Sequence, residues 1–120
     1  MTILIAILLL TGCEKRYEKP ESSQATGGGD EQHGKQLIQQ YGCQSCHTIP
    51  GVQGPKGVVG PPLQKMAMRG YIAGKVPNTP ANMIQWLQNP QTIDPGNAMP
   101  NLGVTASDAK DITAYLFTLK

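Results

Sequence analysis

The sequence predicts an all-α domain in which three main helices are separated by long loops. Apolar residues recur at helical spacing in three segments, and no segment alternates apolar and polar residues as a strand does. The intervening stretches are rich in glycine and proline, which disfavour long helices and central strands. With one phenylalanine, one tryptophan and four tyrosines among 120 residues, the side chains supply a thin core. A large apolar group could complete that core.

Residues 1–12 are expected to form a signal peptide of the lipoprotein type. The apolar run 3–10 is shorter than the roughly 20 residues that span a bilayer, but it has the length of a signal-peptide core. It runs into Leu10-Thr11-Gly12-Cys13, which resembles the lipobox of bacterial lipoproteins, where cleavage precedes a cysteine that is then lipidated. Neither Lys nor Arg precedes the run, which departs from the usual signal. The alternatives are a cleaved signal that leaves a free thiol, and an uncleaved anchor.

Residues 13–29 are expected to carry the lipid on Cys13 and then to form a flexible linker. They are polar and end in a stretch rich in serine and glycine that cannot bury apolar surface. About 16 such residues have a root-mean-square span of roughly 20–25 Å. The folded domain is expected at residues 30–120, held at a membrane by the lipid anchor.

The first helix of that domain is expected at residues 31–41. Asp30 can cap its amino terminus, and Gly42 can end it. The apolar residues at helical spacing are Leu37, Ile38 and Tyr41. His33 lies on the polar first turn, where we expect an exposed, solvated side chain, the alternative being a ligand to a metal or to a metal-containing cofactor.

The residues that organise the domain follow at once, in the run Cys43-Gln44-Ser45-Cys46-His47. Two cysteines separated by two residues and followed directly by histidine indicate a covalent attachment site for haem c. The two thiols would form thioethers with the porphyrin, and the histidine would bind the iron from one face. A structural zinc site needs four ligands, and the only spare Cys or His residues lie at the tail and at the helix start. A thioredoxin-type redox pair needs a βαβ setting that the sequence lacks.

The next part of the chain is expected to be mostly loop. Residues 48–62 are rich in glycine and proline and should wrap around the site. Residues 63–69 could form one or two helical turns, and a loop then follows to residue 80. A helix over residues 80–88 should open at Thr79 or Pro80 and stop before the proline at position 90.

A second loop and a last helix complete the predicted fold. Residues 91–103 contain prolines and glycines on both sides of Met99 and should form a rigid loop. The last helix should be capped at Ser107 or at Thr105 and continue to Leu119, because its apolar residues lie on one face.

From about Gly34 to Lys120 this order of elements resembles the class I c-type cytochromes, which carry a single haem. Among them, the chain is similar to the cytochrome c domains of subunit II of haem-copper oxidases, with which it shares the runs 86–90 (Trp-Leu-Gln-Asn-Pro) and 95–100 (Pro-Gly-Asn-Ala-Met-Pro). The resemblance implies one covalent haem c, bound through Cys43, Cys46 and His47, inside three main helices and long Gly/Pro loops.

The resemblance also implies roles for four further residues. Met99 would be the sixth ligand, a soft thioether on a loop with few unfolded conformations. The carbonyl of Pro61 would accept a hydrogen bond from Nδ1 of His47 and so fix the ring. Arg69 would bind a haem propionate, and Trp86 would pack beside the haem on the methionine side. The alternatives are loop punctuation for Pro61, surface solvation for Arg69 and a plain core position for Trp86.

Two further expectations concern packing. Gly34 and Tyr115 take the positions at which the first and last helices of the family cross, where a glycine lets an aromatic ring approach the backbone. Of the other internal methionines, Met83 should be core, whereas Met66 and Met68 should lie on the histidine side.

With both axial positions filled, one-electron transfer is expected and not catalysis on a substrate. The protein would act as a membrane-tethered carrier, or as a small cytochrome subunit of a respiratory complex, between a redox protein donor and acceptor. It would lie in the bacterial cell envelope, on the outer, periplasmic face of a membrane. A formal charge of +2 offers no basic face for nucleic acid. The alternatives are a peroxidase-like haem enzyme and a gas sensor, in either of which Met99 is displaced.

Overall fold

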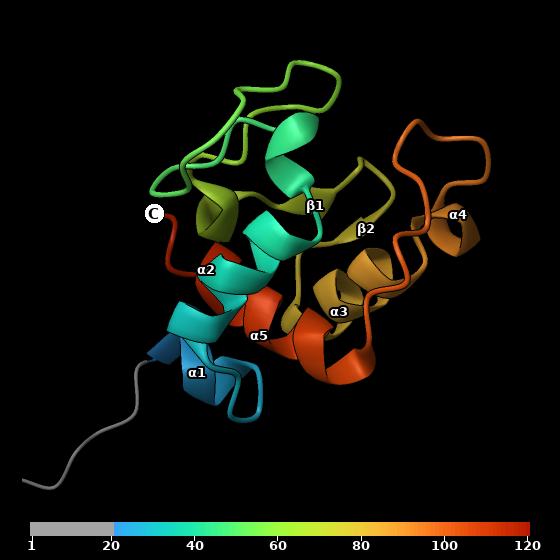
Figure 1. Ribbon diagram of the computed structural model, residues 1–120. Coiled ribbons are helices and arrows are strands. Elements are labelled where there is room, and N and C mark those ends of the chain that lie inside the picture. Colours follow the sequence, from blue (N-terminus) through green and yellow to red (C-terminus); the bar gives the residue numbers. More distant parts are fainter. Residues whose placement is uncertain (1–20) are drawn as a thin grey trace, which may run out of the picture.

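The computed structural model describes residues 21–120, and helices dominate them (Figure 1). The main helices are α2 (Glu31–Gln40), α3 (Pro80–Gln88) and α5 (Ala106–Leu116), which confirms the all-α class and its three helices. The shorter elements are α1 (Glu21–Ala25), the 3₁₀ turns Cys43–Ser45 and Met66–Met68, β1 (Tyr71–Ile72), β2 (Val76–Pro77) and α4 (Pro90–Ile93).

Each main helix starts at a side chain that caps its first turn. Asp30 accepts from the backbone N–H of His33, Thr79 from that of Asn82, and Thr105 from that of Asp108. These oxygens satisfy amide groups that have no partner inside the helix. Of the two caps expected for the last helix, Thr105 is therefore the one used.

The prediction that the chain contains no strand is wrong. Strands β1 and β2 form a short antiparallel hairpin, with Ile72 opposite Val76, inside the stretch expected to be loop. Two residues per strand are too few to show an alternating pattern in a sequence. Helix α4 is likewise unexpected: Pro90 ends α3, as predicted, and also occupies the first turn of the next helix, where its missing N–H costs nothing.

The structure also differs from the flexible linker expected at residues 13–29, in the part that it describes, from residue 21 onward. Helix α1 packs against α5 (Figure 1), and Ser23 and Thr26 are buried. Ser23 donates to the carbonyl of Gly29, whose own N–H donates to Oγ1 of Thr26 at 3.1 Å. Gly29 lies so close to α5 that a Cβ on it would come within 2.6 Å of the Lys110 carbonyl oxygen. This segment is held by hydrogen bonds and by a close approach of its backbone to α5. It buries little apolar surface, so no sequence pattern reveals it. Cys13 and the predicted signal peptide lie outside the described residues.

The most extensive contact between helices is the crossing of α2 and α5, seen in Figure 1. It depends on Gly34, because a Cβ there would lie 2.0 Å from the carbonyl oxygen of Asp111 and 2.9 Å from the backbone nitrogen of Ile112. The predicted glycine at the crossing is present, but its partner is the backbone of α5. Tyr115, one turn further along α5, donates from its hydroxyl to the carbonyl of Pro50 at 2.6 Å.

Asp111 also fastens the first turn of α2. Its carboxylate accepts from the backbone N–H of Asp30 at 2.8 Å and contacts Nδ1 of His33 at 2.8 Å. The hydrogen bond that His33 donates to the Asp111 carboxylate raises the pKa of His33 above its ordinary value of 6.5. His33 is exposed, as predicted, and its ring serves to join the two helices.

We expect Gly34→Ala to destabilise the protein. Alanine favours helix by about 1 kcal/mol over glycine, but here its methyl group would strike the α5 backbone, which has no free rotamer to yield. Overpacking of this kind costs about 1–3 kcal/mol, so the net free energy of unfolding should fall. Urea titration of the haem-loaded protein measures it. Gly70→Ala, at a site with open space, is the matched control, and equal stability of the two variants would contradict the packing argument.

Candidate cofactor-binding site

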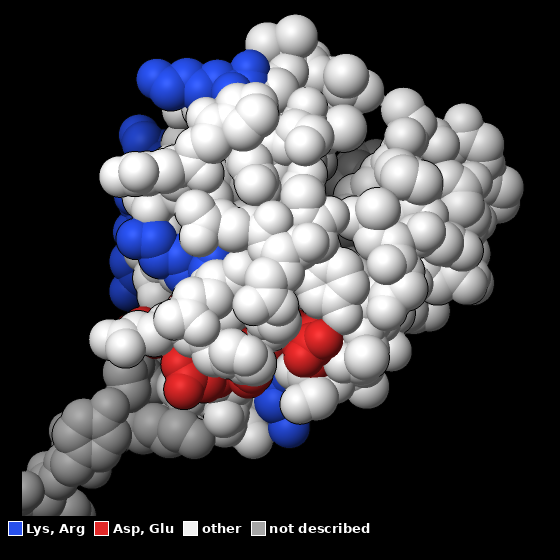
Figure 2. Space-filling model, in the orientation of Figure 1, with Lys and Arg blue, Asp and Glu red and all other residues white. Residues whose placement is uncertain are grey.

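A cavity of about 310 Å³ lies between the two long loops, with α2, α3 and α5 contributing its inner wall. Most of its lining is aliphatic, aromatic or thioether side chain, and the charged residues among the lining set are Arg69 and Asp94. Figure 2 shows the surface hollowed between two lobes, and on this face the charged side chains lie away from the hollow. Such a site suits a large apolar ligand held by a few polar groups.

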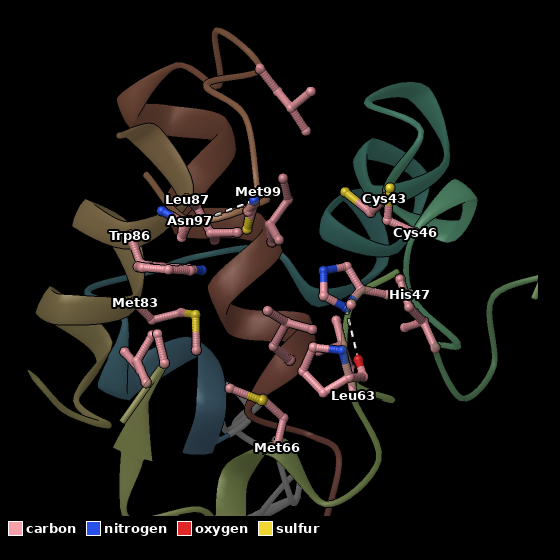
Figure 3. Close-up of a pocket in the computed structure, with 18 of the residues that line it drawn as sticks. Cys43, Cys46, His47, Leu63, Met66, Met83, Trp86, Leu87, Asn97 and Met99 are labelled. Atoms are coloured by element: carbon pink, nitrogen blue, oxygen red, sulfur yellow. Dashed lines mark hydrogen bonds between the residues drawn. The ribbon is translucent and has the colours of Figure 1, made fainter. Parts of the chain in front are cut away.

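One side of the cavity is formed by the Cys-x-x-Cys-His run. The Cys43–Ser45 turn is closed by backbone bonds from the N–H groups of Cys46 and His47 to the carbonyl of Cys43, at 3.2 and 3.0 Å. Nδ1 of His47 lies 2.7 Å from the carbonyl oxygen of Pro61, the contact expected of that proline. A carbonyl can only accept, so Nδ1 donates, and in the neutral imidazole the lone pair then lies on Nε2. Figure 3 shows Nε2 turned into the cavity.

The thiols of Cys43 and Cys46 lie on the rim beside His47 (Figure 3). Both are unbonded and half-buried, and burial raises the pKa of the Cys43 thiol. Within residues 21–120, no group of three or more His, Cys, Asp and Glu side chains could hold a metal ion, so the zinc alternative finds no support there. The βαβ setting of a thioredoxin-type pair is also missing from this part of the chain, whose strands form one hairpin.

Backbone hydrogen bonds hold the loop after His47 over the motif, and the sequence did not predict them. Backbone bonds run from Gly57 to the Gln44 carbonyl at 3.1 Å and from Gly60 to the Cys46 carbonyl at 2.8 Å. A Cβ on Gly60 would lie 2.2 Å from Cε1 of His47, so the glycine backbone packs directly against the imidazole. The available signal was the spacing of glycines at 51, 54, 57 and 60, every third residue.

Met99 faces His47 from the opposite side of the cavity (Figure 3). Its backbone N–H donates to Oδ1 of Asn97 at 2.7 Å, and its carbonyl accepts from the side-chain amide of Gln91 at 2.9 Å. Gln91 did not stand out in the sequence. The loop thus presents one thioether on a backbone that is bonded on both sides of the residue.

The other internal methionines are placed differently. Met83 is 1% exposed and belongs to the core, as predicted, and Met66 is buried in the cavity wall. Met68 is 69% exposed and does not line the cavity. Among the described methionines, Met99 is therefore the one that lies on a loop directly across from His47.

Trp86 and Arg69 both line the cavity. Figure 3 shows the indole nitrogen of Trp86 turned towards the cavity. The guanidinium of Arg69 donates to the backbone carbonyls of Pro62 and Gln64, the latter at 3.0 Å. These bonds leave further N–H groups of the guanidinium for a ligand, since the group carries five. A propionate contact for either side chain stays a prediction.

The donor set fits a covalent haem. An unprotonated imidazole nitrogen and a thioether face each other across an apolar cavity, and two thiols lie on the rim next to the imidazole. The imidazole of His47 and the thioether of Met99 would hold the haem iron, which would supply one-electron redox chemistry.

The comparisons with known proteins agree with this geometry. The family model for cytochrome c matches residues 31–120, and the chain belongs to the cytochrome c family. The resemblance to class I c-type cytochromes is thereby confirmed, and with it a covalently bound haem c that transfers electrons. A curated relative is cytochrome c oxidase subunit 2 of Alkalihalophilus pseudofirmus, 28% identical over 110 residues. The match covers 91% of this chain and 30% of the length of that protein.

Gly60→Ala should displace the imidazole of His47. The added methyl group would overlap the ring, so the ring must leave its hydrogen bond to Pro61 or the loop must lift. We expect a loss of about 1–3 kcal/mol in the free energy of unfolding and a lower yield of covalent haem. Chemical denaturation and the ratio of haem to protein absorbance measure the two effects. Gly70→Ala is again the control, and a variant matching it in both readouts would refute the role given to Gly60.

Proposed function

We propose that the protein transfers single electrons through one haem c, bound by thioethers at Cys43 and Cys46 and ligated by His47 and Met99. The observation that carries this proposal is the opposition of His47 Nε2 and the Met99 thioether across the cavity. When bound, the haem supplies the Fe(III)/Fe(II) couple. With His47 and Met99 both holding the iron, a substrate would have no open site at it.

The chain's own residues would set the properties of that couple. The Pro61 carbonyl, by accepting from Nδ1, raises the basicity of His47 and fixes the plane of its ring. The Met99 thioether favours the reduced state and raises the reduction potential. Arg69, already oriented by two carbonyls, and Trp86, with its N–H turned inward, are the proposed donors to the propionates.

The enzymatic and sensory alternatives need Met99 to leave its place. Of the charged side chains that line the cavity, Arg69 donates to backbone carbonyls and Asp94 pairs with Lys75 at 3.4 Å. A guanidinium bonded to carbonyls and a carboxylate paired with a lysine do not supply a ready distal acid or base, which favours electron transfer.

We propose further that the protein works as a membrane-tethered carrier or as a small subunit of a respiratory complex, in a bacterial envelope. Its support is the lipobox-like run ending at Cys13, and the oxidase subunit among its relatives. Donor and acceptor would be redox proteins of that membrane. Among residues 21–120, the helices are too short or too polar to cross a bilayer.

Met99→Ala tests the ligation. In the ferric protein, the weak absorption band that reports a methionine–iron bond should disappear, and the reduction potential should fall, because a soft ligand is lost. Visible spectroscopy and a redox titration measure both. Met68→Ala removes an exposed methionine and should change neither. If the band survives in Met99→Ala, another residue is the ligand.

Cys13→Ser tests the anchor. Without the thiol no lipid can be attached, so the protein should move from the membrane to the soluble fraction of the cell. Cell fractionation followed by haem staining measures this, since Cys43 and Cys46 are unchanged. Retention of the variant in salt-washed membranes would reject lipid anchoring and leave an uncleaved anchor or a bound partner as the explanation.

A further inference from the structure

We propose that Gln91 is a positioning residue, whose side-chain amide holds the Met99 loop closed and so controls how readily the Met99 thioether leaves the iron. The inference rests on the proposed ligation by Met99. It concerns a side chain that lines no part of the cavity and acts through the backbone of the loop.

All of the polar groups of the Gln91 amide are used on that loop. Its Nε2 donates to the carbonyls of Asn97 and Met99, each at 2.9 Å, and its Oε1 accepts from the N–H of Gly96 at 2.9 Å. The partners fix the orientation of the amide, because two carbonyls require the NH₂ group and a backbone N–H requires the oxygen. One side chain therefore bonds three residues of a four-residue segment.

The remaining hydrogen bonds of the loop are local. Asn97 donates through its backbone and side-chain nitrogens to the carbonyl of Asp94, the residue that caps α4, at 3.2 and 2.6 Å, and it accepts from Met99 (Figure 3). The bonds to Asp94 hold the start of the loop but do not reach Met99 itself. Within the described chain, the hydrogen bonds from the body of a helix to residues 95–103 all come from Gln91.

The helix that carries Gln91 is itself held firmly in the fold. Gln91 lies on α4, where the neighbouring Pro90 is fully buried and the helix packs against α3. The ion pair of Asp94 with Lys75, at 3.4 Å, is partly exposed, and pairs of that kind contribute little. The amide of Gln91 is thus the polar link between the thioether loop and the core.

Displacement of Met99 by another ligand requires the loop to open. Removing the Gln91 bonds should raise the open fraction by roughly a factor of 5–30, the effect of losing one or two net hydrogen bonds. An external ligand that binds only the open form gains apparent affinity in proportion to that fraction. Gln91 would therefore determine the exchange of the sixth ligand without touching it.

The test is a titration of the haem-loaded ferric protein with imidazole, followed by visible absorption at neutral pH. Gln91→Ala should bind imidazole roughly 5–30 times more tightly than the unchanged protein. Gln91→Glu keeps the volume and the acceptor for Gly96 but sets a carboxylate oxygen against two carbonyls, so it should behave like Gln91→Ala. Gln85→Ala, at an exposed glutamine on α3, should leave the affinity unchanged.

A double variant separates this inference from the ligation itself. In a Met99→Ala background the thioether is gone, so adding Gln91→Ala should not raise the imidazole affinity further. An equal gain in both backgrounds would show that Gln91 acts on general stability and would overturn the inference. If Met99→Ala alone leaves the imidazole affinity and the methionine band unchanged, then the proposed ligation of the iron by Met99 is wrong.

Amide hydrogen exchange of the unaltered protein gives a second measurement that needs no variant. Gly96 is exposed, and the acceptor of its N–H is the Gln91 side chain. We expect this amide to exchange slowly, together with that of Met99. Free exchange of Gly96 at the rate of an open loop would mean that the amide of Gln91 does not hold it, and the proposal would fall.

Discussion

The contact of α2 with α5 at Gly34 places the two sides of the cofactor cavity relative to one another. The Cys-x-x-Cys-His run begins three residues after the end of α2, and the Met99 loop ends just before the cap of α5. Each side of the cavity is therefore a short extension of one of the two crossed helices. Because α5 approaches α2 backbone to backbone, the separation of the two helices is set by a residue without a side chain.

The two sides are held by different means. On the histidine side, backbone bonds and glycines press the loop against the motif, and the thioethers would add covalent bonds. On the methionine side, the side-chain amide of Gln91 makes three hydrogen bonds that join the loop to α4. If Met99 ligates the iron as proposed, that weak bond would depend on how firmly this loop is held, while the imidazole is fixed in its place. Exchange of ligands would then take place on the methionine face of the haem.

The sequence predicted the elements that repeat a pattern or use a motif. Helices α2, α3 and α5 carry apolar periodicity and capping residues, and the haem motif is a fixed spacing of three residue types. The rest depends on contacts between distant residues. Helix α1 is polar and held by hydrogen bonds to its own turn, and the β1–β2 hairpin is too short for periodicity. Gln91 resembles any surface glutamine until its three partners are known.

The glycines at 51, 54, 57 and 60 also affect the conformational entropy that the loop after His47 loses when the chain folds. Gly51 and Gly54 have positive φ, whereas Gly57 and Gly60 lie too close to the motif for a Cβ. Each glycine gives the unfolded chain roughly 0.4–1 kcal/mol of extra conformational entropy relative to alanine, so four oppose closure by about 2–4 kcal/mol. The backbone hydrogen bonds of Gly57 and Gly60 to the motif offset part of this term. A haem that filled the cavity would offset more of it through apolar contacts with the loop, so cofactor binding and loop closure would stabilise each other.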